Sequence, residues 1–285
     1  MSTGKPPSAT RTAIWNVQRL FGSVGLAAHR QLFMQLVLRE IAGRYRGSTL
    51  GILWSMLTPL LMLGIFTFVF GSVFRSRWAG SADHTSTGDF SVILFTGLIV
   101  FQLFSEIVTK APTLVLSNSN YVKKVVFPLE ILAPGAVGSA LFHAAVSFAV
   151  LLVIKLAVSG SIPLTAFLLP IVLAPLVLLC LGLSWFLSSL GVYYRDINQI
   201  LGTLVTALMF LSPIFYPISA LPAWLQTWLV FNPIALPVEQ ARNVAVFGNQ
   251  PHWPPLVIYW IVSCLIAWLG YRWFQKTSKG FADVL

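Results

Sequence analysis

The sequence predicts an all-α integral membrane protein with six transmembrane helices, an N-terminal amphipathic interface helix and short re-entrant helices before the last span. Two observations predict this fold class. The 285 residues are 57% hydrophobic and only 9% charged, whereas about a quarter of the residues in soluble domains are charged. Residues 52–74 carry no charge at all. A run of this length crosses the roughly 30 Å hydrocarbon core of a bilayer as one helix.

One transmembrane domain, residues 29–285, is expected to follow a flexible cytoplasmic tail of residues 1–28. The tail is polar and rich in Pro, Ser and Thr, without the apolar segment of a cleaved signal peptide. Cys180 and Cys264 lie inside apolar runs, which favours packing over a disulfide or a metal pair. The predicted spans cover about residues 52–74, 90–108, 131–154, 164–190, 199–218 and 256–274.

The distribution of basic residues predicts the orientation in the membrane. Six spans place both termini on one side, and most Lys and Arg residues fall on that side. Only Arg75, Arg77, Lys155 and Arg242 fall on the other. Cytoplasmic loops carry an excess of Lys and Arg, so both termini are expected to be cytoplasmic. The net charge of +10 therefore indicates topology and anionic headgroups, and no nucleic-acid partner is expected.

Residues 29–46 have the pattern of a helix that lies in the membrane interface. Gln31, Gln35, Arg39 and Arg46 form one narrow polar stripe at helical spacing, while apolar residues cover the rest. Glu40 and Arg44 are four residues apart, so they can form an ion pair. Two interpretations of this helix stay open: a membrane anchor, or a contact for a partner protein.

Residues 118–130 form a cytoplasmic loop that is too polar to span the membrane. Its polar start, basic centre and apolar end suit a short docking helix for a partner. The candidate residues are Asn118, Tyr121, Lys123, Lys124, Phe127 and Pro128.

Residues 219–255 are apolar, yet Pro222, Pro233 and Pro237 divide them into pieces too short to cross the membrane. We expect two short helices that dip in from the outer face, with Glu239 and Arg242 at their rim. Backbone broken in this way is stable where protein or a water-filled cavity satisfies it. The alternative is a surface hairpin with Trp224 and Trp228 in the aromatic belt.

Aromatic residues suggest a path for a ligand. Phe66, Phe70 and Phe74 recur every four residues on one face of the first span. Sugar rings stack on aromatic faces, but the same stripe is also typical of a face turned to lipid or to packing. Tyr193, Tyr194, Arg195 and Asp196 stand together at the inner entrance of the fifth span.

His143 lies inside the third span, where an ionisable group is a functional candidate by default. A structural histidine that bonds to a neighbouring helix is the alternative interpretation.

The motifs of catalysis and of ion coupling are not found in the sequence. The phosphate-binding pattern G-x-x-x-x-G-K-[ST] does not occur, nor do H-E-x-x-H or a cysteine ligand cluster. We therefore predict no catalytic residue and no metal site. Glu106 lies near the inner end of the second span and no acid lies deeper, which disfavours coupling to protons or sodium. Energy for transport would have to come from another subunit.

Four segments carry a family resemblance. They are LREIAGRYRGSTLGILWSMLTPLLMLGIFTFVFG, NSNYVKKVVFPLEIL, GVYYRDINQILGTLVTALMFLSPIFYP and FNPIALPVEQAR. They resemble the membrane subunit of type-2 ABC exporters for bacterial polysaccharides. The resemblance implies a homodimer in the bacterial inner membrane that pairs with two ATPase subunits, which bind ATP and Mg²⁺. It also implies export of an undecaprenyl-linked polysaccharide of the O-antigen or capsule type.

The same resemblance implies roles for the candidate residues. The ATPase-coupling residues would be Arg39, Arg44, Arg46, Asn118, Tyr121, Lys123, Lys124, Phe127 and Pro128. The residues lining a glycan channel would be Trp54, Phe66, Phe70, Phe74, Tyr193, Tyr194, Phe210, Phe215 and Tyr216. The outer gate would contain Trp224, Trp228, Glu239 and Arg242. Membrane lipids would surround the dimer.

Other functions stay open from the sequence. The same architecture could export teichoic acid, a lipid or a drug. A polytopic glycosyltransferase would need catalytic acids, but Asp83, Asp89, Asp196 and Asp283 are dispersed. A scaffold without an ATPase partner is a further alternative.

Overall fold

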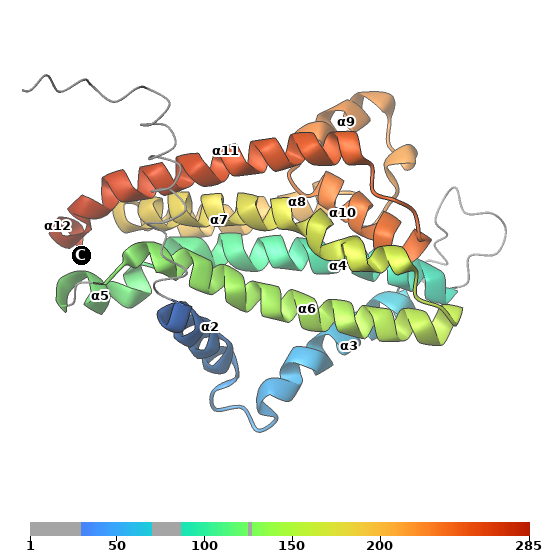
Figure 1. Cartoon of the computed structure of the whole chain (residues 1–285), viewed down its shortest axis with the longest axis horizontal. Helices are drawn as coiled ribbons and strands as arrows, with labels where there is room; N and C mark the ends of the chain where they lie inside the picture. Colours follow the sequence, from blue (N-terminus) through green and yellow to red (C-terminus); the bar gives the residue numbers. More distant parts are fainter. Residues whose placement is uncertain (1–29, 70–86, 125–126) are drawn as a thin grey trace, which may run out of the picture.

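The computed structural model describes residues 30–69, 87–124 and 127–285, and every regular element of these residues is a helix (Figure 1). The longer helices are α2 (Arg30–Tyr45), α3 (Trp54–Phe66), α4 (Thr87–Lys110), α6 (Leu132–Ser159), α7 (Leu169–Tyr193), α8 (Ile197–Leu211) and α11 (Trp253–Thr277). The shorter helices are α5 (Ser119–Lys124), α9 (Ala223–Trp228), α10 (Ala235–Arg242) and α12 (Phe281–Val284). The predicted all-α class is confirmed for these residues. The predicted tail, residues 1–28, lies outside them, as do Phe70 and Phe74.

Five helical segments of the described residues are long and apolar enough to cross a membrane. They are Gly51–Val69, Phe90–Thr113, Leu129–Ser159, Leu164–Tyr193 and Trp253–Val284. Each contains or overlaps one predicted span. The chain is therefore a multi-pass membrane protein.

The predicted fifth span is wrong at its end. It was expected to reach residue 218, but α8 ends at Leu211. Ser212 is extended, with ψ of 149°, because the ring of the following Pro213 disfavours helical backbone at the residue before it. At 1.5 Å per residue, α8 covers about 22 Å, which is less than the roughly 30 Å of a bilayer core.

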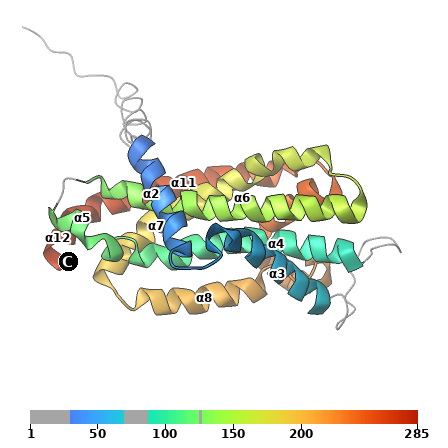
Figure 2. The same cartoon turned by 90° about the horizontal axis from the view of Figure 1, so that it is seen from below.

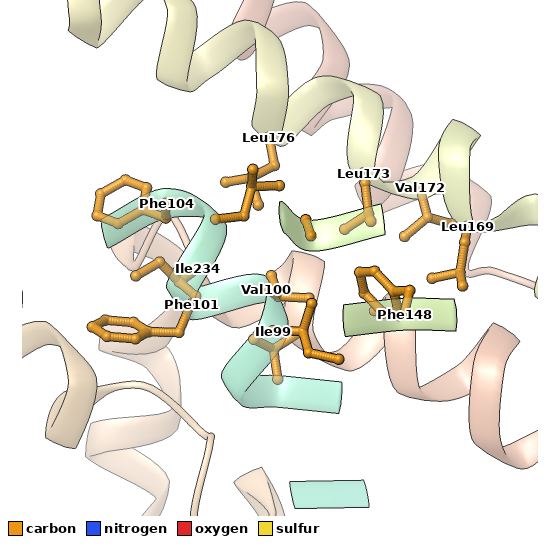
Figure 3. Packing of buried hydrophobic residues seen from close by; sticks show 14 of the residues in the cluster. Ile99, Val100, Phe101, Phe104, Phe148, Leu169, Val172, Leu173, Leu176 and Ile234 are labelled. Atoms are coloured by element: carbon orange, nitrogen blue, oxygen red, sulfur yellow. The ribbon is translucent and has the colours of Figure 1, made fainter. Parts of the chain in front are cut away.

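Helix α4 is the centre of the bundle. Among the five membrane-capable segments it is the most buried, at 72% of its residues, and it contacts α3, α6, α7, α8 and α10. Figure 3 shows Val100 and Phe104 of α4 packed with Leu176 of α7 and Ile234. Helices α2 and α3 lie at the edge of the bundle, where both contact α6 (Figure 2), and α3 contributes Leu63 to this core.

Helices α7 and α11 run side by side and make a close contact through two glycines. A Cβ built on Gly182 would lie 2.6 Å from the Cα of Ala267, and one on Gly270 would lie 2.1 Å from the carbonyl oxygen of Gly182. Small residues allow this approach, which is the usual basis of helix packing in membranes.

A second apolar core, separate from the one around α4, lies at the end of the bundle that carries α5 and α12. We call it the α5-end core. It contains buried Leu36, Val115, Ile131, Leu132, Ala133, Trp185, Val192, Tyr271, Phe274 and Phe281, with partly buried residues of α2 and α5 packed against it. It joins α2, α5, α7, α11 and α12 in one cluster.

The chain between α8 and α11 forms two short helices, α9 and α10, as predicted for residues 219–255. They lie at the opposite end of the bundle from α5 and α12 (Figure 1). Pro222, in extended backbone, precedes α9, and Pro233 separates α9 from α10. Most of α10 is buried against α4 and α7, whereas α9 exposes its tryptophans.

Candidate functional site

Helix α2 and the loop around α5 meet through one arginine. Arg39 donates hydrogen bonds to the hydroxyl of Tyr121 at 2.6 Å and to Oδ1 of Asn118 at 3.0 Å. Its guanidinium also lies over the Tyr121 ring, 5.6 Å from the centroid. The Tyr121 ring in turn stacks on Phe127 at 4.4 Å. The structure therefore brings together four of the residues predicted to couple to an ATPase.

The remaining predicted coupling residues are placed differently. Arg46 is exposed just after α2. Pro128 is extended and precedes the short helical turn that leads into α6. The side chains of Lys123 and Lys124 lie outside the part of the chain that the structure describes.

Arg44 is partly exposed and reaches from α2 to side chains of α4 and α6. Its Nη1 donates to Oε1 of Glu106 at 2.7 Å, and Nδ1 of His143 lies 2.8 Å from the same oxygen. Nη1 of Arg44 also lies 3.0 Å from Nδ1 of His143, so the three side chains form one polar cluster. The predicted structural role of His143, a bond to a neighbouring helix, is confirmed. Its Nε2 is buried and has no hydrogen-bond partner among the described residues.

The ion pair that the spacing of Glu40 and Arg44 allows is not formed. Glu40 instead bonds to Lys110 at the end of α4, and Arg44 bonds to Glu106 one helical turn earlier. Residues four apart on an isolated helix pair only weakly. Here α2 packs beside α4 and α6, so acids and bases on the neighbouring helices offer less exposed partners. Two ion pairs thus join α2 to α4.

These ion pairs line a polar cavity of about 650 Å³ between α2, α4 and α6. A second, more apolar cavity of about 370 Å³ shares Arg44, Glu106 and His143 with it and extends under α3, where Trp54 lines it. Tyr45 stands beside both, with its ring edge-on to His143 at 6.0 Å. Burial raises the pKa of the Tyr45 phenol above its ordinary value.

Three predicted channel aromatics form a cluster near the end of α8. The ring of Phe215 lies 6.3 Å from Phe66 of α3 and 6.1 Å from Phe210 of α8. The hydroxyl of Tyr216 donates to the carbonyl oxygen of Phe210 at 2.9 Å. The cluster therefore joins α3 to the break after α8. Phe70 and Phe74, predicted for the same path, lie outside the described residues.

A polar stripe on α8 was not predicted from the sequence. Gln199, Thr203 and Thr206 are exposed on one face of this helix, at spacings of three and four residues. They line a groove of about 510 Å³ that ends at Phe210. The signal was present in the sequence, because hydrogen-bonding residues at helical spacing inside an apolar helix indicate a face turned to water or protein.

The linker between α7 and α8 places Tyr194, Arg195 and Asp196 on the surface. Tyr193 is also exposed, at 42% of its surface, while its hydroxyl donates to the carbonyl oxygen of Thr277 and its ring packs on Phe281 of the α5-end core. The structure therefore separates Tyr193 from the Phe215 cluster, with which it was expected to share a channel.

Of the predicted outer-gate residues, Trp224 and Trp228 are exposed, each at 66%, while Glu239 is half-buried. Arg242 does not lie at a rim: it is buried, with 3% of its surface exposed. Its guanidinium donates to the carbonyl oxygens of Ile93 at 3.0 Å and of Pro213 and Ile214 at 2.6 Å each. The carbonyl groups of Pro213 and Ile214 lie in the non-helical backbone after α8, and Arg242 supplies their hydrogen-bond donors.

Among the residues that the structure describes, no three His, Cys, Asp or Glu side chains come together to hold a metal ion.

Comparison with known proteins adds a family and several relatives. A model of the family described as ABC-2 type transporter matches residues 31–246. The O-antigen export system permease protein RfbA of Myxococcus xanthus is 26% identical over 260 residues, which are 90% of this chain and 96% of the relative. The polysialic acid transport protein KpsM of Escherichia coli is 28% identical over 223 residues, or 75% of this chain and 80% of the relative. The capsule polysaccharide export inner-membrane protein CtrC of Neisseria meningitidis serogroup B is 27% identical over 265 residues, or 90% and 94% of the two chains.

Proposed function

This chain belongs to the ABC-2 type transporter family, and from that premise we propose that it is the membrane subunit of a polysaccharide exporter. The cargo is an undecaprenyl-linked polysaccharide of the O-antigen or capsule class, moved across the bacterial inner membrane. The observation that carries the proposal is that relatives matching 75–90% of the chain are named for export of O-antigen or capsule polysaccharide and for transport of polysialic acid.

We infer that the path for the glycan runs along α8. A polar stripe exposed on an apolar helix is unfavourable against lipid, and it is stable against water or another protein. Helix α3 stands beside the same region and is almost unburied, at 6% of its segment. In this proposal two copies of the chain join through α3 and α8 and enclose an aqueous channel. The Phe66, Phe210 and Phe215 rings lie at its outer part, where they give the sugar chain apolar faces on which to stack.

We infer that the ATPase subunits, two copies with bound ATP and Mg²⁺, dock at the α5 end. The Arg39 contact to Tyr121 and Asn118 makes α2 and α5 one surface, and the ion pairs of Arg44 and Glu40 link that surface to α4. A change imposed on α5 is thus passed to the transmembrane helices. In this orientation both termini are cytoplasmic, as the distribution of basic residues also predicts.

The proposed function is tested by deleting the gene and analysing lipid-linked and surface glycans of the same cells. We expect long polymers to accumulate inside while the surface loses them, and we expect a plasmid copy of the gene to reverse both changes. The sugars of the accumulated polymer identify the cargo. A surface glycan that is unchanged in the deletion strain would overturn the proposal in favour of lipid or drug export, and accumulation of a polyol phosphate polymer would favour teichoic acid.

Substitution of Phe215 by alanine is expected to lower export several-fold while the amount of protein in the membrane stays the same. The reason is that Phe215 touches both other rings of the cluster, so its loss opens the proposed stacking surface. Phe215→Trp, which keeps an aromatic face, is expected to retain export. Phe231→Ala serves as the matched control, because this ring is 79% exposed at the same end of the bundle. Pulse labelling of surface glycan measures the rate, and equal rates in Phe215→Ala and wild type would exclude Phe215 from the path.

A further inference from the structure

The C-terminal segment is tightly built into the α5 end of the bundle. After α11, a turn at Ser278–Gly280 leads into the four-residue helix α12, whose Phe281 is completely buried. The Phe281 ring packs on Phe274 at 5.6 Å and on Tyr193 at 6.1 Å. The sequence pattern of this segment, short and partly charged, gave no sign that it contributes to a core.

Hydrogen bonds fix the turn that presents α12. The carbonyl oxygen of Thr277 accepts from the Tyr193 hydroxyl at 3.1 Å, and the Thr277 hydroxyl lies 2.6 Å from that of Ser189. Both partners belong to α7. The main chain and the side chain of Thr277 therefore both bond to α7. These bonds fix the turn after α11, and with it the direction in which Phe281 points.

Helix α12 also contacts α5, and both figures of the whole chain place the two helices next to each other (Figures 1 and 2). Phe281 and Leu285 belong to the α5-end core, together with Tyr121, Val122 and Phe127 from α5 and the residues after it. The C-terminal segment thus fills the space between α5 and the long helices α7 and α11.

Helix α5 depends on such contacts for its position. A helix of six residues is far below the length at which helices are stable in water, so packing must hold it. On one side it is held by Arg39, through Tyr121. On the other side it rests on the apolar cluster that Phe281 completes. Removal of either contact leaves α5 attached through the remaining one.

We propose that Phe281 is a positioning residue for the ATPase subunit: through the α5-end core it fixes the orientation in which α5 meets that partner. The proposal rests on the docking role given to α5 under the proposed function. It adds the C-terminal segment to the coupling apparatus, although Phe281 itself has no exposed surface with which to touch a partner.

The test compares Phe281→Ala, Phe281→Leu and the matched control Val284→Ala, which removes an exposed side chain of the same helix. The purified permease and its cognate ATPase subunit are titrated for binding, and amide hydrogen exchange is followed in the permease alone. We expect Phe281→Ala to weaken binding roughly tenfold and to speed exchange in residues 119–124, with exchange in the middle of α4 unchanged. Phe281→Leu keeps most of the apolar volume, so its affinity and exchange rates are expected to be close to those of wild type. Val284→Ala is expected to have the affinity and exchange rates of wild type.

Two results would overturn the inference. One is wild-type exchange in residues 119–124 of Phe281→Ala, since α5 would then not rest on this ring. The other is wild-type affinity despite faster exchange, since the orientation of α5 would then not matter to the partner. If the wild-type permease itself binds no ATPase, the proposed function fails instead. If Phe281→Ala cannot be purified, Tyr193→Phe, which removes only the bond to Thr277, is expected to show a smaller change in the same direction, and no change there would count against the inference.

Discussion

Replacement of Glu106 by arginine is expected to abolish export, and the double variant Arg44→Glu/Glu106→Arg is expected to restore a large part of it. In wild type the Glu106 carboxylate accepts from Arg44 and lies 2.8 Å from Nδ1 of His143. The single variant places two guanidinium groups against each other at the joint between α2 and α4. Hydrogen bonds to charged groups contribute about 1.5–3 kcal/mol each, so the joint is expected to open.

The exchanged pair rebuilds the joint with the charges reversed. In the double variant the carboxylate introduced on α2 accepts from the guanidinium introduced on α4. Arg30→Glu is the control, because Arg30 is an exposed arginine at the other end of α2 and does not belong to the joint. Surface glycan, the amount of permease in the membrane and copurification of the ATPase are measured in each strain. If the double variant is present in the membrane at the wild-type amount but exports no better than Glu106→Arg, the ion pair is not what couples α2 to α4.

Loss of the Arg242 side chain is expected to have the largest effect on stability of any single substitution considered. In Arg242→Ala, the carbonyl oxygens of Ile93, Pro213 and Ile214 lose the guanidinium donor. The Ile93 oxygen keeps its backbone donor inside α4, but those of Pro213 and Ile214 lie in non-helical backbone. A buried acceptor without a donor costs about 1–3 kcal/mol, so these two lower the free energy of unfolding by on the order of 2–6 kcal/mol. We expect little folded protein and no export. Arg242→Lys keeps the charge, but a single ammonium group lacks the planar fork that reaches three acceptors, so it is expected to rescue poorly.

Gly97 offers an independent test of the same contact. A Cβ at this position would lie 2.7 Å from Nη2 of Arg242, so Gly97→Ala displaces the guanidinium without changing it. We expect a lower melting temperature than wild type and reduced export. The control is Arg272→Ala, which removes an exposed arginine that lies over the Trp268 ring. A protein with Arg242→Ala that melts and exports like wild type would show that the break after α8 holds its shape without this arginine.

The helices could be predicted from the sequence, but many of the side-chain contacts between them could not. Long apolar runs and prolines are local signals, and they located five membrane-capable helices and both short helices α9 and α10. The partners of Glu40 and Arg44 are Lys110 and Glu106, which lie on another helix. Only the relation between residues four apart on one helix was available to the sequence analysis, and that relation indicated a pair that is not formed.

Arg242 is a second residue whose contacts could not be predicted from local sequence patterns. Its spacing from Glu239 suggested a pair of charges at a surface. The stronger signal was Pro213, because a proline that ends an apolar helix leaves carbonyl groups that need donors. Which donor reaches them depends on how α10 packs against α4, and no short-range pattern contains that information. The aromatic cluster was predicted residue by residue for Phe66, Phe210 and Phe215, but the sequence did not show that their rings touch.

The sparse packing of α3 has a consequence for the way in which the protein is made. Chains fold from the N-terminus during synthesis, so α3 reaches the bilayer before α4, α6 and the other helices that form the core. With 6% of its segment buried even in the finished subunit, it gains little from their arrival. Its insertion must therefore be favourable by itself, through transfer of its apolar side chains from water to lipid. The order of insertion thus sets a minimum hydrophobicity for α3 that does not depend on how the later helices pack.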